Sequence, residues 1–228
     1  MSDLFSPVAA VRASASIDTT VADRRVPRGL TRFAGAALLA FPALFSAGMV
    51  FSPPQTEEGD AGYIASLAAD PATSLLSANL LHHSWVALAL GVMGLILLVG
   101  RRGRVWVSLT AVLVAFGAIQ MSGLLLSDWF LVAAGNVLTP DQAVLLNATA
   151  KDDSMMPWFL TAQLLGLGGL LALSLGLARA KVVSWWIAPL PLFAFLVPVL
   201  NIGVFAAIAF IPLMAPIIVA GVKLMRLR

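Results

Sequence analysis

Two adjacent histidines, His82 and His83, and one acid further along the chain, Asp128, are the residues whose types could do chemistry together. An imidazole that is hydrogen-bonded to a carboxylate has a fixed orientation and a raised pKa. Such a pair can serve as a general base. A pairing of Asp128 with either histidine is therefore the arrangement that an enzyme built on this chain would use.

Three side-chain amides are expected at a depth in the membrane similar to that of the histidines. Counted along helices, these residues fall roughly 24–29 Å from the basic residues that bound their apolar segments. One interpretation is an outward-facing polar pocket. The other is that these side chains form hydrogen bonds between neighbouring helices, as polar residues in membrane bundles commonly do. The candidate pocket comprises His82, His83, Gln120, Asp128, Gln163 and Asn201.

Metal and cofactor chemistry is not indicated. Adjacent histidines on a helix point about 100° apart, so they do not readily face one metal ion. The chain has no cysteine and only two histidines, and it contains no HExxH or phosphate-binding glycine loop. We expect no metal site and no cofactor. We also expect a non-enzymatic role rather than catalysis.

The composition identifies the class of protein. Of 228 residues, 60% are apolar and 11% are charged, and the mean hydropathy is +0.96. Soluble domains are about 45–50% apolar and about 25% charged. These values exclude an ordinary soluble enzyme, a disordered chain and a nucleic-acid-binding module, although the chain carries a net charge of +3.

The apolar residues form long runs without charges, which predicts an all-α polytopic transmembrane helical bundle. We expect residues 1–29 to be a disordered cytoplasmic tail and residues 30–228 to form the transmembrane domain. The last apolar run is too long for one span and is divided at Asn201. Six spans are predicted, at about 33–51, 79–100, 105–126, 157–178, 183–199 and 203–223.

Charge asymmetry predicts that both termini are cytoplasmic. With that orientation, Lys151 is the only basic residue in an outer segment, and the other 13 of the 14 are inside. The inner residues are Arg12, Arg24, Arg25, Arg28, Arg32, Arg101, Arg102, Arg104, Arg179, Lys181, Lys223, Arg226 and Arg228. The outer segments hold most of the acids, namely Glu57, Glu58, Asp60, Asp70, Asp128, Asp141, Asp152 and Asp153.

The outer segments also predict local order. Residues 60–69 are expected to form a short helix capped by Asp60, and Asp70-Pro71 is a helix start. Residues 140–149 are expected to form a second short helix, with Thr139 and Gln142 as a capping box.

The order of several short motifs resembles a group of multi-pass membrane proteins common in actinobacterial genomes. The motifs are Gly59-Asp60-Ala61-Gly62-Tyr63, Asp70-Pro71, Leu81-His82, Arg101-Arg102-Gly103-Arg104 and Ser127-Asp128-Trp129. They cover about residues 25–228. The resemblance implies a bacterial plasma membrane and no particular activity.

The leading hypothesis is a non-enzymatic accessory or binding component of the plasma membrane with an outward-facing polar pocket. One alternative is a facilitator or a transporter of lipids or small molecules, and another is a membrane enzyme that uses a His/Asp pair. The expected partners are the lipid bilayer and other membrane proteins or a second copy of the chain, with no nucleic acid.

Overall fold

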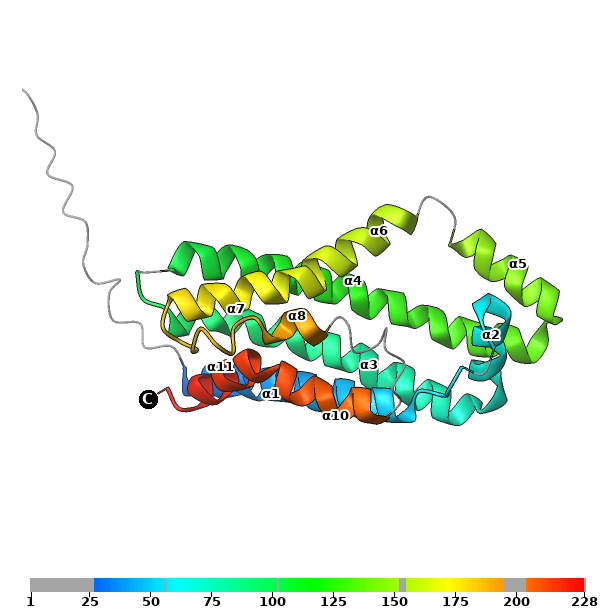
Figure 1. Ribbon diagram of the computed structural model, residues 1–228, viewed down its shortest axis with the longest axis horizontal. Coiled ribbons are helices and arrows are strands. Elements are labelled where there is room, and N and C mark those ends of the chain that lie inside the picture. The colour runs from blue at the N-terminus through cyan, green and yellow to red at the C-terminus, as the bar shows by residue number, and fades with distance from the viewer. Residues whose placement is uncertain (1–26, 56, 102, 152–154, 195–203, 228) are drawn as a thin grey trace, which may run out of the picture.

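The computed structural model describes residues 27–55, 57–101, 103–151, 155–194 and 204–227 (Figure 1). Within these ranges the chain is helical and contains no strand. Four helical segments are long and apolar enough to cross a membrane. They are α1 (Arg28–Phe51), α3 with its 3-10 extension η2 (Pro71–Val92 and Met93–Leu98), α4 (Arg104–Val137), and α6–η4–α7 (Met156–Thr161, Ala162–Gly168 and Gly169–Arg179).

A fifth candidate span is the bent pair α10 (Val204–Leu213) and α11 (Ala215–Met225). The two helices meet at an angle of 54°. Pro216 lies at the start of α11 and lacks a backbone N–H, so it cannot continue the hydrogen-bond ladder of α10. The described residues thus supply four or five candidate spans, as expected for a protein embedded in a membrane.

The predicted span at 183–199 is not a regular helix where it is described. Residues 180–189 form turns, and α8 (Leu190–Ala194) contains only five residues. Pro189 and Pro191 interrupt any α-helical ladder here. Residues 195–199, and the predicted turn at Asn201, lie outside the described residues.

Other predicted boundaries need smaller corrections. The helix expected at 33–51 already begins at Arg28, so residues 28 and 29 are not part of a disordered tail. The helix expected to end at residue 126 continues to Val137, because residues 127–134 contain no glycine or proline that would break it. Asp70 does cap α3, and its carboxylate accepts a hydrogen bond from the Thr73 amide.

The helices pack side by side around one apolar core. In Figure 1, α1 lies against α3 and against α10 and α11, α3 against α4, and α4 against η4 and α7. Four aromatic rings fill the centre between α1, α3 and α10. The rings of Phe45 and Phe210 stack at 4.0 Å, and Phe41 and Trp85 pack at 5.5 Å. All four are buried.

The two ends of the bundle differ in charge. Figure 1 places the start of α1, the start of α4, the end of α7 and the end of α11 together at one end. We call this the basic end, because it carries the described residues Arg28, Arg32, Arg101, Arg104, Arg179, Lys181, Lys223 and Arg226. The opposite, acidic end is formed by α2 (Gly59–Ala69), α5 (Pro140–Ala150) and the adjoining ends of α3 and α4.

The crossing of α4 and η4 depends on a pair of glycines. A Cβ atom on Gly117 would lie 2.1 Å from the backbone nitrogen of Gly166, so no side chain fits at this position. Small residues at such crossings let helix backbones approach closely.

We predict that Gly117→Ala destabilises the bundle by about 1–3 kcal/mol, because two backbones must separate to admit the methyl group. The corresponding fall in Tm in detergent is several degrees, at roughly 2–4 °C per kcal/mol for a chain of this size. Gly168→Ala is the matched control, since its Cβ would meet nothing within 4 Å. Equal Tm values for the two variants would contradict this packing.

Candidate functional site

His82 joins α3 to α4 through Ser122. Its Nδ1 atom lies 2.8 Å from the Ser122 hydroxyl oxygen and 3.3 Å from the Ser122 carbonyl oxygen, and the imidazole tautomer decides which atom donates. The ring also lies 6.2 Å from that of Trp129 on α4. His82 is half-buried and Ser122 is buried, so this is an interhelical contact in the interior.

His83 makes a separate hydrogen bond, although its ring packs edge-on against that of His82, with the ring centroids 4.9 Å apart. It is exposed, and its Nδ1 lies 2.7 Å from the carbonyl oxygen of Asn79, one turn earlier in α3. Because a carbonyl oxygen only accepts, Nδ1 must carry the proton in this hydrogen bond. His83 is therefore satisfied by its own helix.

The predicted pairing of Asp128 with a histidine is replaced by a pairing with a tyrosine. The Tyr63 hydroxyl of α2 donates to an Asp128 carboxylate oxygen of α4 at 2.7 Å. Both side chains are half-buried. Among the hydrogen bonds of the described residues, none links Asp128 to His82 or His83, which turn toward Ser122 and Asn79 instead.

The three amides are not brought into one cluster with these groups. Gln120 has its Oε1 atom buried, with no hydrogen-bond partner among the described residues. Gln163 is half-buried within the π-helical segment η4. Asn201 lies outside the described residues. The polar residues of the spans thus supply separate contacts more than a shared cavity.

The acidic end has its own small core. Ile64 and Leu67 of α2, Leu131 and Val132 of α4, and Ala143 of α5 pack together as buried residues. The Asn147 amide donates to an Asp60 carboxylate oxygen at 2.8 Å and connects α5 to α2 across 87 residues of sequence. Two short helices are therefore held on the ends of α3 and α4 as one ordered unit.

Of the two predicted helix caps, the structure confirms that of α5 and not that of α2. The Thr139–Gln142 capping box of α5 is present, with both reciprocal hydrogen bonds. Asp60 does not cap α2: Glu58 occupies the N-cap position, without a side-chain hydrogen bond, and Asp60 lies in the first turn. There its charge suits the helix dipole, and it accepts the bond from Asn147.

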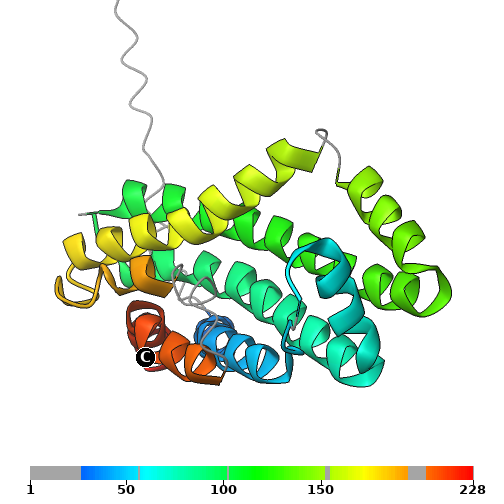
Figure 2. The same ribbon diagram turned by 45° about the vertical axis from the view of Figure 1, so that its right-hand side comes forward.

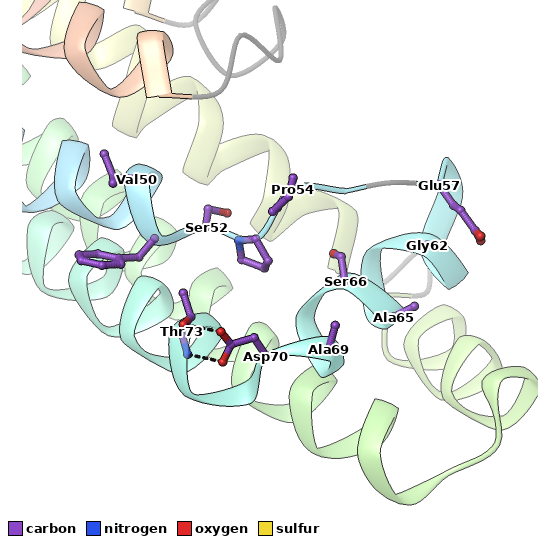
Figure 3. A pocket seen from close by; sticks show the side chains of 12 residues that line it. Val50, Ser52, Pro54, Glu57, Gly62, Ala65, Ser66, Ala69, Asp70 and Thr73 are labelled. Carbon is purple, nitrogen blue, oxygen red and sulfur yellow. Dashed lines mark hydrogen bonds between the residues drawn. The ribbon is translucent and has the colours of Figure 1, made fainter.

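A cleft of about 520 Å³ opens at the acidic end, between the end of α1, the connection to α2, and the start of α3 (Figure 3). Ser52 and Pro54 lie on one side and Thr73 and Asp70 on the other, while Glu57 directs its carboxylate away. We call it the outer cleft. Its lining residues are Val50, Phe51, Ser52, Pro53, Pro54, Glu57, Gly62, Ala65, Ser66, Ala69, Asp70 and Thr73.

The shape of the outer cleft depends on a close backbone approach. A Cβ atom on Gly62 would lie 2.2 Å from the Glu57 carbonyl oxygen, so only glycine lets the connection fold over α2. At the edge of the cleft, the exposed Asp70 carboxylate accepts from the Thr73 hydroxyl at 2.7 Å. This bond and that from the Thr73 amide hold the pKa of Asp70 below its usual range.

The chemistry of the outer cleft is that of a binding site. It offers an ionised carboxylate, the Asp70 group, together with hydroxyls and an apolar wall of valine, phenylalanine, proline and alanine side chains. Such a lining complements a small organic cation with an apolar body. The described residues contain no group of three His, Cys, Asp or Glu side chains that could hold a metal ion.

Comparisons of the chain with protein-family models, with curated proteins and with solved structures found no match.

The sequence predicted the local signals at the outer cleft without predicting the cleft. Asp70-Pro71 was identifiable as a helix start, and Ser52-Pro53-Pro54 as a helix end. That these two ends lie side by side depends on the antiparallel packing of α1 and α3, which no local pattern specifies. Tyr63 and Ser122 carried no sequence signal for the hydrogen bonds that they form with Asp128 and His82.

Burial raises the pKa of the Tyr63 phenol well above its usual value of about 10, and the Asp128 carboxylate raises it further. The folded protein therefore keeps this proton when the unfolded chain releases it. The stabilisation is complete below about pH 10 and is lost as the pH rises toward the folded pKa. Tyr63 is the only tyrosine, so tyrosinate absorbance reports this group alone.

We predict that tyrosinate absorbance appears only as the fold opens in alkali, and that Tyr63→Phe removes the corresponding loss of stability above about pH 10. At neutral pH the same variant lowers the free energy of unfolding by about 1–3 kcal/mol, because the Asp128 carboxylate loses the hydrogen bond that it accepts from the Tyr63 hydroxyl. Thermal unfolding in detergent measures both effects. In an Asp128→Asn background the cost should shrink. A reversible titration near pH 10 in the folded protein would disprove the burial.

Proposed function

We propose that the chain is a non-enzymatic binding component of the plasma membrane, with its recognition site in the outer cleft. The observation that carries the proposal is the outer cleft itself, which is lined by the Asp70 carboxylate, while Glu57 directs its carboxylate away. The ordered unit of α2 and α5 supports it, because a preformed site loses little entropy on binding.

A six-span arrangement with both termini cytoplasmic is part of the proposal. The start of α1 and the end of α11 lie together at the basic end, and α7 also ends there (Figure 1). α10 begins away from the basic end and leads into α11, which ends there, and α8 precedes α10 in the chain. The excess of Arg and Lys at the basic end supports a cytoplasmic location for that end.

The proposed ligand class is a small organic cation with an apolar portion. Asp70 supplies the opposite charge, and acids dominate this end of the bundle. The apolar wall would contact the rest of the ligand. Phe41, Phe45, Trp85 and Phe210 fill the bundle interior, which favours binding at the outer end over passage between the helices.

Catalysis has less support. Among the described residues, the pair that most resembles a nucleophile and its base is Ser122 and His82. A substrate carbonyl would have to reach the Ser122 hydroxyl, but this residue is only 5% exposed, in the α3–α4 interface. The hydrogen bond therefore serves to hold two helices together.

We predict that the protein in nanodiscs binds a short-chain alkyltrimethylammonium probe, and that Asp70→Asn weakens the binding by about tenfold, the effect of losing roughly 1.4 kcal/mol of charge attraction. Isothermal titration calorimetry measures the affinity. Asparagine caps helices as well as aspartate does, so the start of α3 should remain intact.

Asp141→Asn is the matched control, because it removes the same charge from α5, outside the lining of the outer cleft. Its affinity for the probe should stay close to that of the unchanged protein. Equal weakening in both variants would mean that the probe responds to the general charge of the acidic end, and the outer cleft would lose its role.

A further inference from the structure

A second cleft lies on the other side of α4, where α6 diverges from it (Figure 2). Its volume is about 330 Å³. We call it the lysine cleft, because among the described residues its one charged lining residue is Lys151, which follows α5. The other lining residues are Leu124, Ser127, Met155, Met156 and Phe159. It shares no residue with the outer cleft.

The position of Lys151 is unusual for its charge. It is the only basic residue in the outer segments of the sequence, where acids predominate. Its ammonium group acts electrostatically on Asp128, so the two side chains belong to the same part of the acidic end. A basic residue that serves only topology belongs at the basic end. A local charge interaction, with Asp128 and with a ligand of the cleft, is a better explanation of its place.

The level of the lysine cleft matches the boundary of a bilayer. Leu124 follows Arg104 by twenty residues of helix, and Phe159 precedes Arg179 by the same number, which corresponds to about 30 Å. The hydrocarbon core of a bilayer is also about 30 Å thick. With the basic residues at one boundary, the apolar part of the lysine cleft lies at the other, and Lys151 lies at the level of lipid headgroups.

The walls fit an acyl chain better than a polar solute. Met156 and Phe159 expose about half of their surface, at 52% and 45%, toward the side where α4 and α6 part. Methionine side chains are flexible and polarisable and adapt to irregular apolar ligands. The Ser127 hydroxyl already donates to the Leu124 carbonyl oxygen, so it does not need a polar group of the ligand as an acceptor.

We propose that the lysine cleft binds one phospholipid of the leaflet at the acidic end, with the lipid phosphate at the Lys151 ammonium and an acyl chain along Met156 and Phe159. An ammonium group is a strong point charge for a phosphate. This site is independent of the outer cleft, and its failure would leave the proposed binding of cations there untouched.

The test is native mass spectrometry of the protein released from nanodiscs of equal parts phosphatidylglycerol and phosphatidylethanolamine. We expect one phospholipid to remain bound after collisional activation that strips the others. Lys151→Gln should lower the occupancy at least fivefold, whereas Lys151→Arg should retain it. Arg226→Gln is the matched control, an exposed basic residue at the basic end, and should retain the lipid fully.

A second variant tests the cleft without touching its charge. Leu124→Trp should fill the apolar space and lower the occupancy even with Lys151 present, and Asp70→Asn should have no effect. Equal lipid retention in the unchanged protein, Lys151→Gln and Leu124→Trp would overturn the proposal, because it would mean unspecific boundary lipid. Retention of a fatty acid or detergent in place of phospholipid would also overturn it, because the phosphate would then have no role.

Discussion

The length of α4 is the constraint on which the rest of the structure depends. Its 34 residues extend about 51 Å, whereas a bilayer core accommodates only about 30 Å of helix. The last four turns must therefore emerge from the hydrocarbon region. These turns are covered by other elements, because Leu131 and Val132 belong to the small core in which α2 and α5 pack on α4. One continuous helix thus joins the membrane bundle to the ordered unit of α2 and α5. It also fixes both clefts relative to the spans.

Interhelical polar contacts give the described residues that first suggested chemistry separate partners. In a low-dielectric interior each buried polar group must find a partner close by. His82 finds Ser122 on α4, Asp128 finds Tyr63 on α2, and Asn147 finds Asp60. Each bond ties a different pair of elements. Four buried side-chain atoms of the described residues have no such partner and are exceptions to this rule: Ser46 Oγ, Gln120 Oε1, Trp129 Nε1 and Ser174 Oγ.

Hydropathy and capping signals predicted the elements well, because they are local. The four long apolar helices, the Asp70 cap and the Thr139 capping box were all foreseen from neighbouring residues. Partners were not foreseen. The choice of Tyr63 over a histidine for Asp128 depends on how α2 packs on α4, through Ile64 and Gly135. The prolines at 189 and 191 predicted an irregular fifth span, but not that residues 180–189 form turns and that α8 has only five residues.

Asp128 lines neither cleft but interacts with a residue near each of them. Its carboxylate accepts the Tyr63 hydroxyl, and Tyr63 lies on the same short helix as Gly62 and Ser66, which line the outer cleft. The same carboxylate interacts electrostatically with Lys151 in the lysine cleft. Any change to Asp128 therefore alters the support of one cleft and the charge of the other at once. Asp70 and Lys151 each belong to only one cleft, and so substitutions at these two residues, and not at Asp128, can separate cation binding from lipid binding.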